Sequence, residues 1–545
     1  MKALVTCAQA RELDAATRAA LKLSSIQLME KASLRLWDAL RARIAELPAL
    51  SGKGGALRIV ALCGHGDNGG DALAMLRHAY SAGFSCLGAI VSAREAGETP
   101  RMQALSLAAA GVPILSWSAE AEARALLKNA DLVLDGILGT GVRGAAAGEA
   151  AAMIGALNGL EKGGGATPGM AARPHIASID LPSGLGDGWR AGMPCVQADS
   201  TLSLDPAKAI CFTPEARQAC GMMIPVDDVF PASLVSQNVA ISLLEASDLD
   251  RLAPSVGDAG YKTSRGRLAI FAGSEGALGA AQLCAKAAIA SGAGYITLYV
   301  DDPLYPLAAP VLESVIVKPL SGLAGIPACD AILVGPGWGR GAGRKDLLAA
   351  ILASGTPAIL DADAIHILAE NPELASAAKA PCALTPHPGE FAALEKAFLG
   401  GREGEPFLNA LAEASRAAGM LTLYKSSLTW IAEPGGSLAV WEGRTPELGT
   451  AGSGDVLAGL FAGLAAVSLA SRSALGGGKP ARQAPQSAGD ALRGAAHCAV
   501  VAHGLAGRRL AREKGWFGAA DLAAECALIM RGASRAQSIG AGSGA

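Results

Sequence analysis

The sequence predicts an α/β protein with two tandem domains, each a three-layer α/β/α arrangement in which helices cover both faces of a parallel sheet. Three observations predict this class. The chain has 545 residues, more than one domain usually contains. Hydrophobic residues make up 51% of it, enough to bury substantial cores. Short apolar runs rich in β-branched residues alternate with Ala- and Leu-rich helical patterns, once over residues 1–230 and again over 266–532.

The strands of the first domain are expected where apolar runs end in loops that contain glycine or proline. Such loops mark the change from strand to helix in a parallel α/β domain. The runs with this pattern are 57–63, 131–135, 175–180 and 221–226.

The pattern restarts after residues 231–265, which contain prolines, serines and glycines without a sustained period, so we expect a connection between domains there. Residues 427–442 predict a β-hairpin within the second domain. Composition alone predicts flexible insertions at 161–174 and 472–490 and a flexible tail at 533–545. The other strands of the second domain are expected at 267–272, 294–300, 331–335, 357–361, 382–386 and 421–425.

Composition also excludes several classes of partner. Lys and Arg number 46 against 49 Asp and Glu, a formal net charge of −3 without a long run of one sign, so we expect no nucleic-acid and no membrane partner. The apolar stretch 456–471 is too short for a membrane span and is expected to be a buried helix. Cys occurs at 11 scattered positions with no CxxC pair, which indicates reduced thiols and a cytoplasmic location.

Three loops of the first domain contain candidate functional residues. They follow strands at the edge where parallel sheets bind ligands: GHGDNGGD, which ends at Asp71, DGILGTG, which begins at Asp135, and DLPSGLGDG, which begins at Asp180. The glycines of the first loop expose amides before a helix expected to begin near Asp71, an arrangement that can cradle an anion. Asn68, Asp135 and Ser183 offer oxygen ligands suited to a hard, weakly hydrated cation rather than to zinc. A tight turn at the glycines and capping roles for the aspartates remain alternatives.

Together these motifs resemble the NAD(P)H-hydrate epimerase family, whose patterns are GPGNNGGDG, D-x-[LI]-[FL]-G-T-G and D-[IL]-P-S-G. Residues 8–33 also look like the first helices of that family. The resemblance implies a Rossmann-like domain that interconverts the R and S epimers of hydrated NADH and NADPH. His65, Asp67 and Ala72 stand where the family has Pro, Asn and Gly, and Asp67 adds a negative charge beside a substrate that carries a pyrophosphate.

The same resemblance implies roles for individual residues. Asn68, Asp135 and Ser183 would hold a potassium ion (K⁺). Asp180 is the first candidate for proton transfer near C6 of the hydrated ring, and Asp71 is the second. Contacts with the hydrate are implied for Asp67, Asn68, Gly69, Gly70, Asp71, Gly139, Thr140, Gly141, Val142, Arg143, Gly144, Ala145 and Asp180.

The second domain has a glycine-rich loop immediately before its longest apolar stretch. Gly452, Ser453 and Gly454 place successive amides at the start of an expected helix, where a transferring phosphoryl group would be stabilised. Asp455 follows and is placed to accept a proton from a substrate hydroxyl, although an aspartate at a helix start can also be purely structural. His387 lies between two prolines in a loop after a strand, which favours a contact with a ligand.

Several segments here resemble the ADP-dependent NAD(P)H-hydrate dehydratase family, which has a ribokinase-like fold. The family patterns GSxxxxGA, GPGxG, LDADA, LTPHPGE and GTGDVLAG stand in this chain as GSEGALGA, GPGWG, LDADA, LTPHPGE and GSGDVLAG. The resemblance implies that ADP binds with Mg²⁺ and that Asp455 helps the C6 hydroxyl attack its β-phosphate, after which phosphate leaves. Ser426 stands where the family's nucleotide loop has glycine. Hydrate contacts are implied for Ala280, Gly337, His387 and Asp455, and nucleotide contacts for Lys425, Ser426, Ser427, Leu428, Thr429, Gly452, Ser453 and Gly454.

The two resemblances predict a bifunctional metabolite-repair enzyme whose first domain produces the epimer that the second dehydrates. Its expected partners are the hydrates NADHX and NADPHX together with ADP, and the chain is expected to form a homo-oligomer. One alternative stays open: a ribokinase-like kinase of a small alcohol, fused to a non-catalytic nucleotide-binding domain. An NAD-dependent oxidoreductase is disfavoured, because an acidic residue that could bind a ribose is not evident about 20 positions after GHGDNGGD.

Overall fold

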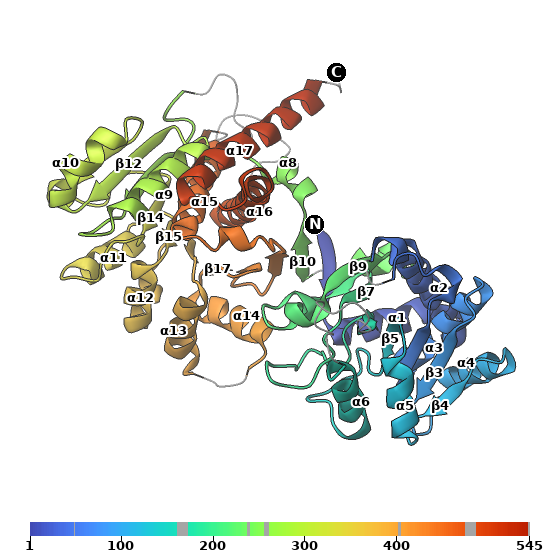
Figure 1. Ribbon diagram of the computed structural model, residues 1–545. Coiled ribbons are helices and arrows are strands. Elements are labelled where there is room, and N and C mark those ends of the chain that lie inside the picture. The colour runs from blue at the N-terminus through green and yellow to red at the C-terminus, as the bar shows by residue number, and fades with distance from the viewer. Residues whose placement is uncertain are drawn as a thin grey trace. The chain divides into compact units, whose positions relative to one another are not determined.

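The computed structural model describes the chain except for residues 48–49, 161–172, 237–239, 255–260, 402–404, 475–486 and 543–545. The chain divides into two compact units (Figure 1). The N-terminal unit comprises Ala3–Ile241 and Pro406–Leu408. The C-terminal unit comprises Met1–Lys2, Ser242–Glu405 and Asn409–Ala545.

The N-terminal unit contains a seven-stranded sheet with the order β4-β3-β2-β5-β6-β7-β9, and all neighbouring strands in it are parallel. The pattern of the sequence predicts β2, β5, β6 and β9 and misses the other three strands. A further parallel pair joins β1 to β8. The bounds are β1 (Lys2–Val5), β2 (Ile59–Cys63), β3 (Leu87–Val91), β4 (Ile114–Ser116), β5 (Leu132–Gly136), β6 (His175–Ile179), β7 (Ser200–Leu204), β8 (Ala207–Lys208) and β9 (Met222–Val226).

Helices cover both faces of this sheet, as the sequence predicts. Along β2, Ile59, Ala61 and Cys63 pack into a core with helices α2, α3 and α4, whereas Val60 and Leu62 pack on the opposite face with α5 and α6 (Figure 1). This alternation with a period of two is that of a strand buried on both faces. The helix bounds are α1 (Cys7–Leu21), α2 (Ser25–Arg43), α3 (Asp67–Ser81), α4 (Glu98–Ala109), α5 (Glu120–Lys128) and α6 (Gly148–Asn158).

The C-terminal unit contains a larger sheet with the order β13-β12-β11-β14-β15-β16-β17-β18-β19-β10. The strands from β13 to β17 are parallel, and β17, β18 and β19 are antiparallel, so the hairpin expected at 427–442 is confirmed. The bounds are β10 (Ile241–Leu244), β11 (Arg267–Phe271), β12 (Tyr295–Val300), β13 (Ile316–Pro319), β14 (Ala331–Val334), β15 (Ala358–Leu360), β16 (Cys382–Leu384), β17 (Leu421–Tyr424), β18 (Thr429–Ala432) and β19 (Leu438–Trp441).

One face of this sheet packs with α9, α15, α16 and α17, and the other with α11, α12 and α13. In α15, the segment Ser453–Arg472 is long and apolar enough to cross a membrane, but 89% of its most apolar window is buried within the protein. It is therefore the buried core helix that the sequence predicts. The bounds are α9 (Leu278–Ala290), α11 (Arg344–Ala353), α12 (Asp363–Glu370), α13 (Pro388–Leu399), α14 (Phe407–Ala418), α15 (Ser453–Ala474), α16 (Ala488–Lys514) and α17 (Ala519–Gly542).

The segments between and beyond the expected domains contain regular structure. Residues 231–265, expected to be a connection, include the short helices α7 (Ala232–Val235) and α8 (Leu249–Leu252) as well as β10. Helix α17 continues to Gly542, through most of the expected tail. Most of the two expected insertions, 161–174 and 472–490, lies outside the described residues.

Candidate active sites

The loop between β2 and α3 lies too close to a neighbouring backbone for a side chain at Gly64. A Cβ atom there would overlap the carbonyl oxygen of Ile137, and the Gly64 N–H donates to the Gly136 carbonyl at 3.0 Å. Helix α3 begins at Asp67 and not near Asp71, so the sequence prediction of its start is wrong by about one turn. The first-turn N–H groups of α3, which lack partners within the helix, therefore lie at the carboxyl edge of the sheet.

The three residues predicted to bind K⁺ converge around the backbone of Leu138. Asn68 Nδ2 donates to the Leu138 carbonyl at 2.9 Å. Ser183 Oγ accepts from the Leu138 N–H at 2.8 Å and donates to its carbonyl at 3.0 Å. The Ser183 N–H in turn donates to Asp135 Oδ2 at 3.0 Å. Loops that follow β2, β5 and β6 are thus held together through oxygen-bearing side chains.

The Asp135 carboxyl group is fully buried, which raises its pKa, while hydrogen bonds from Ser178 and Ser183 oppose this rise. Ser178 Oγ donates to it at 2.6 Å and the Ile137 N–H at 3.3 Å. The described residues contain no group of three or more His, Cys, Asp or Glu side chains that could hold a metal ion. Asn68, Asp135 and Ser183 carry oxygen atoms, which suit a hard cation better than a transition metal.

Asp180 forms a buried ion pair with Lys208, a residue that the sequence analysis misses. Lys208 Nζ donates to Asp180 Oδ1, and the Leu204 N–H donates to the same oxygen at 3.2 Å. Asp180 has φ of 67°, in the left-handed region that non-glycine residues rarely adopt and that is enriched at functional sites. The only sequence signal for Lys208 is a lone lysine within the apolar run Ala207–Phe212.

Burial also affects Asp71, the second candidate for proton transfer. It raises the pKa of this carboxyl group well above the usual value, and the nearby carboxylates of Asp67 and Asp180 add to the rise. Among the described residues, its buried Oδ1 atom has no hydrogen-bond partner. A carboxyl group whose protonated form is favoured therefore lies near the Asp180–Lys208 pair, an arrangement that can place a proton donor beside a proton acceptor.

The loop 139–145 lies beside the first turn of α3 and beside α1. A Cβ atom at Gly139 would lie 3.2 Å from Asn68 Cβ, and Arg11 of α1 donates from Nη1 to the Thr140 carbonyl. Asp187, from the loop after β6, accepts from the first N–H groups of α1 at 2.7 and 2.9 Å. Helix α1 is therefore fixed to the predicted substrate loop 139–145 and to the loop after β6.

The predicted hydrate contacts differ in what they can offer a ligand. Asp67 is exposed and Asn68 is half-buried, whereas Gly69 and Gly70 are buried and have only backbone atoms to present. A Cβ atom at Gly70 would lie 2.6 Å from Met29 Cε, so this glycine faces α2 and not the site. In the second loop, Thr140 and Val142 are half-buried, and Gly141, Arg143, Gly144 and Ala145 are exposed.

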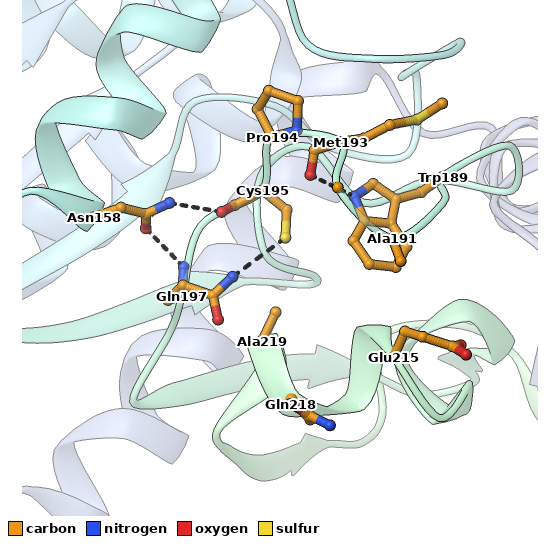
Figure 2. Close-up of a pocket in the computed structure, with 11 residues that line it drawn as sticks. Asn158, Trp189, Ala191, Met193, Pro194, Cys195, Gln197, Glu215, Gln218 and Ala219 are labelled. Atoms are coloured by element: carbon orange, nitrogen blue, oxygen red, sulfur yellow. Dashed lines mark hydrogen bonds between the residues drawn. The ribbon is translucent and has the colours of Figure 1, made fainter.

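A cavity of about 460 Å³ in the same unit is a separate feature (Figure 2). Its lining residues lie before β7 and β9 in the chain or at the C-terminal end of α6, so they lie toward the amino ends of these strands. Asn158 donates to the Cys195 carbonyl at 2.8 Å and accepts from the Gln197 N–H at 2.9 Å, and Trp189 Nε1 donates to the Met193 carbonyl at 3.2 Å. These polar groups satisfy one another and not a ligand.

In the C-terminal unit, the glycine-rich loop leads directly into α15. Gly452 has φ of +87°, and a Cβ atom there would overlap Leu283 of α9 and approach Ala519 of α17 to 3.0 Å. Asp455 lies in the first turn. Burial and, to a smaller extent, the charge of Asp361 raise its pKa to about 6, although Lys425 opposes the rise. A carboxyl group with this pKa can exchange protons near neutral pH.

Lys425 lies among carboxylates beneath this helix start. Its Nζ donates to Asp361 Oδ1 at 2.6 Å, and a Cβ atom at Gly454 would lie 3.4 Å from the same Nζ. The charges of Asp361, Glu390 and Asp455 hold the pKa of Lys425 above its usual value even though its burial lowers the pKa. The sequence analysis predicts Lys425 as a nucleotide contact but assigns no role to Asp361 or Glu390.

His387 caps helix α13. Its Nδ1 accepts from the N–H groups of Gly389 and Glu390 at 3.0 and 3.2 Å, and Glu390 accepts in return from the His387 N–H at 2.8 Å. This reciprocal pattern is a capping box. Because Nδ1 is an acceptor here, the proton of a neutral ring lies on Nε2, and the half-exposed ring presents that edge beside Glu390.

The remaining predicted contacts of the C-terminal unit fall in two places. Gly337 has φ of +54°, and a Cβ atom there would lie 3.1 Å from Ala280 Cβ, so the GPGWG and GSEGALGA segments meet. Residues 425–429 form the turn between β17 and β18, in which Ser426 Oγ donates to the Leu428 carbonyl at 2.7 Å. Leu428 is buried and Ser427 exposed, so only part of this turn can contact a nucleotide through side chains.

Comparison with protein families defines each half of the chain as a known type of domain. Residues 25–210 match the model described as YjeF-related protein N-terminus, and residues 268–529 match the model described as NAD(P)H-hydrate dehydratase. The bifunctional NAD(P)H-hydrate repair enzyme Nnr of Moorella thermoacetica is 31% identical over 533 residues, which cover 94% of this chain and 93% of that protein. The Nnr enzyme of Gloeobacter violaceus is 32% identical over 85% of this chain and 89% of its own length.

The chain therefore belongs to the family of bifunctional NAD(P)H-hydrate repair enzymes, with an N-terminal epimerase domain and a C-terminal dehydratase domain. Among solved structures, the ADP/ATP-dependent NAD(P)H-hydrate dehydratase of Bacillus subtilis, co-crystallised with ATP and Mg²⁺, aligns with a TM-score of 0.43 at 22% identity. That alignment covers 54% of this chain and 98% of the Bacillus protein.

Proposed function

We propose that the chain repairs hydrated NADH and NADPH in two steps. The N-terminal unit interconverts the R and S epimers, and the C-terminal unit dehydrates the S epimer with ADP, which yields NAD(P)H, AMP and phosphate. Family membership supports the proposal. The observation that carries it is the start of α15, where helix amides, a carboxyl group with a pKa of about 6 and the ammonium of the half-buried Lys425 come together.

In the epimerase step, C6 of the hydrated ring carries a hydroxyl group and is bonded to the ring nitrogen. Its configuration can invert only if one of these bonds breaks and re-forms on the opposite face, which requires a proton acceptor and a proton donor. Asp180, which pairs with Lys208, is the proposed acceptor. Asp71, whose protonated form burial favours, is the proposed donor. The first turn of α3, Asp67–Asp71, and the loop Gly139–Ala145 are the proposed substrate-binding segments.

K⁺ at Asn68, Asp135 and Ser183 is part of the proposed epimerase site. Their oxygens meet around Leu138, and a cation there would offset the cost of the fully buried Asp135 carboxylate. When bound, the ion would hold the three loops together and add positive charge near the substrate. The hydrogen bonds of these three side chains already hold the loops in place without the ion.

In the dehydratase step, Asp455 accepts the proton of the C6 hydroxyl as that oxygen attacks the β-phosphate of ADP. The amides of Gly452, Ser453 and Gly454 stabilise the charge of the transferring phosphoryl group. The bond between the β-phosphorus and the bridging oxygen of AMP breaks, so AMP leaves. Phosphate then leaves from C6 while C5 loses a proton to solvent, and the double bond between C5 and C6 re-forms. Residues 425–429 are the proposed nucleotide loop, and Ala280, Gly337 and His387 the proposed hydrate contacts.

Mg²⁺ would enter this site together with ADP and neutralise the charge of the phosphates. The described residues contain no cluster of three or more metal-binding side chains, which fits an ion held mainly by the nucleotide. Lys425 and the helix amides supply positive charge from the protein itself.

Recovery of NADH tests the proposal. The protein is mixed with both epimers of NADHX, ADP and Mg²⁺, and the absorbance of NADH is followed. Asp455→Asn should abolish recovery and leave epimer exchange intact, whereas Asp180→Asn should abolish epimer exchange and leave dehydration of the S epimer intact. Recovery at the parent rate in Asp455→Asn would rule out its proposed role, and a stable phosphorylated product without loss of phosphate would indicate a small-alcohol kinase instead.

We also propose a cytoplasmic location and a homo-oligomeric state. All 11 cysteines are free and nine of them are buried, which fits a reducing compartment. Leu307 and Val311 of the C-terminal unit are 58% and 52% exposed and offer apolar surface for self-association. Analytical ultracentrifugation measures the oligomeric state directly, and sedimentation as a monomer would contradict the proposed homo-oligomer.

A further inference from the structure

The proposed chemistry of the C-terminal unit gives no role to the buried carboxylate of Asp361. Asp361 follows β15, and only 1% of it is exposed. Its Oδ1 atom accepts from Lys425 Nζ and from Thr385 Oγ1, both at 2.6 Å. Burial of a carboxylate is costly unless cations or donors compensate it, and these two contacts supply that compensation.

Asp361 fixes where the Lys425 ammonium lies. The Lys425 N–H donates to the Pro386 carbonyl at 2.8 Å, so the backbone of this residue is tied to the loop after β16. From there its side chain reaches Asp361, and its Nζ lies within 3.4 Å of where a Cβ atom at Gly454 would be. The ammonium therefore lies directly under the first turn of α15, next to the amides that receive the phosphate in the proposed reaction.

We propose that Asp361 is a positioning residue of the dehydratase site, which holds the Lys425 ammonium beneath Gly454 and balances its charge beside Asp455. The inference rests on the proposed function of the C-terminal unit and adds a residue to it. Asp361 itself touches neither hydrate nor nucleotide in this account. It acts through Lys425, which faces the transferring phosphate, and through its own negative charge, which acts on Asp455.

Asp361 and Lys425 have opposite effects on the pKa of Asp455. Asp361 disfavours the charged form of Asp455, and Lys425 favours it. The other ionisable groups that face this helix start are Glu390 of α13, Cys284 of α9, whose Sγ donates to the Asp455 carbonyl at 3.2 Å, and His503 of α16, 3.1 Å from the Ser453 carbonyl. Burial lowers the pKa of His503 to about 4 and raises that of Cys284, so both are neutral at neutral pH.

The test is the pH profile of NADH recovery by the full-length chain with saturating S-NADHX, ADP and Mg²⁺. The rate should fall at low pH as Asp455 takes up a proton. In Asp361→Asn this acid limb should move to lower pH, and in Lys425→Met it should move to higher pH. Thr385→Val is the matched control, because it removes the second donor to Asp361 but no charge, and its acid limb should stay at the parent pH.

A loss of rate should accompany the shift. We expect kcat of Asp361→Asn to fall at least about tenfold, less than the 10²–10³-fold loss typical of removing a direct donor to a developing oxyanion. Because Asp361 acts through Lys425, the double variant Asp361→Asn/Lys425→Met should lose no more kcat than Lys425→Met alone. The double variant contains neither charge of the pair and so leaves no unpaired charge in the site. It can therefore be measured even if a single variant does not fold.

Two results would overturn the inference. One is an acid limb in folded Asp361→Asn at the parent pH or above it. The other is a double variant whose loss of kcat is the product of the two single losses. Failure of the parent chain to recover NADH would instead refute the proposed function, so the two failures are distinguishable.

Discussion

Lys208 is the single residue whose replacement should most change the N-terminal site. It is 2% exposed and pairs with Asp180, so Lys208→Met leaves a buried carboxylate without its cation. Removal of one partner of a buried pair typically costs about 3–5 kcal/mol. We expect a lower free energy of unfolding, measured by urea denaturation, and slower exchange of the R and S epimers, measured by chromatography. Lys31→Met is the control, because Lys31 is exposed and its Nζ donates to a backbone carbonyl, that of Val229, at 3.0 Å. Equal exchange rates in the two variants would contradict the role of Lys208.

Asp455 sets the pH dependence of dehydration in the parent chain. Its pKa is about 6, so the carboxylate that accepts the proton is present above this pH and is lost as the pH falls through it. We expect the rate of NADH recovery from S-NADHX to rise with pH around 6 and to level off above about 7. Epimer exchange in the same samples is the internal control, since Asp455 takes no part in it. An acid limb shared by both activities would show that the whole chain, and not Asp455, titrates there.

The sequence identifies residues that could act in catalysis or binding, but it does not show which charged side chains form ion pairs. Asp180, Asp455 and the oxygen donors around Leu138 could be predicted because they lie in short motifs after strands. The pairs Asp180–Lys208 and Asp361–Lys425 could not, because their members are 28 and 64 positions apart and meet only when the sheets form. The same holds for the raised pKa of Asp71, which comes from burial and from carboxylates that include Asp67 of the same helix and Asp180 of another loop.

The turn from β2 into α3 depends on close backbone contact at one glycine. A Cβ atom at Gly64 would overlap the Ile137 carbonyl, whereas one at Gly66 meets nothing within 4 Å. Gly64→Ala should therefore destabilise the N-terminal unit by about 1–3 kcal/mol, as overpacking does, and slow epimer exchange by moving the loop. Gly66→Ala should change the free energy of unfolding by less than about 1 kcal/mol. Thermal unfolding and the exchange assay measure both effects, and two variants of equal stability would contradict the close contact.

Two of the three strands that the sequence pattern misses in the N-terminal unit are polar or very short. Strand β7 has the sequence STLSL, whose polar residues suggest a loop, yet Thr201 Oγ1 donates to the Cys220 carbonyl at 2.7 Å and Ser200 Oγ lies 2.9 Å from His175 Nε2. Burial of these hydroxyls is tolerated because each has a partner. Strand β4 has only three residues, too few for a period to show. By contrast, the long apolar α15 could be predicted as buried from composition alone.

At the scale of the whole molecule, the repeated α/β rhythm is enough to predict two domains. Each half contains alternating strands and helices that bury one sheet on both faces, which is the packing that such a pattern favours. The order of the strands does not follow from the pattern, since β2 and β11 lie inside their sheets although they come early in each half. Of the antiparallel end of the second sheet, only the hairpin of β18 and β19 could be predicted from the sequence.

If each unit carries its own complete site, the two activities should be separable and should recombine in solution. With an equal mixture of R- and S-NADHX, the Asp180→Asn chain should quickly recover NADH from the S epimer only and then slow to the rate of spontaneous epimerisation. Addition of the Asp455→Asn chain, which cannot dehydrate, should restore full recovery, because the S epimer that it produces can diffuse to the other protein. The control is addition of the double variant Asp180→Asn/Asp455→Asn, which supplies the same protein mass without either activity. Recovery that stops at the S fraction in the complementing mixture, while the parent chain converts everything, would show that the epimer passes only within one chain.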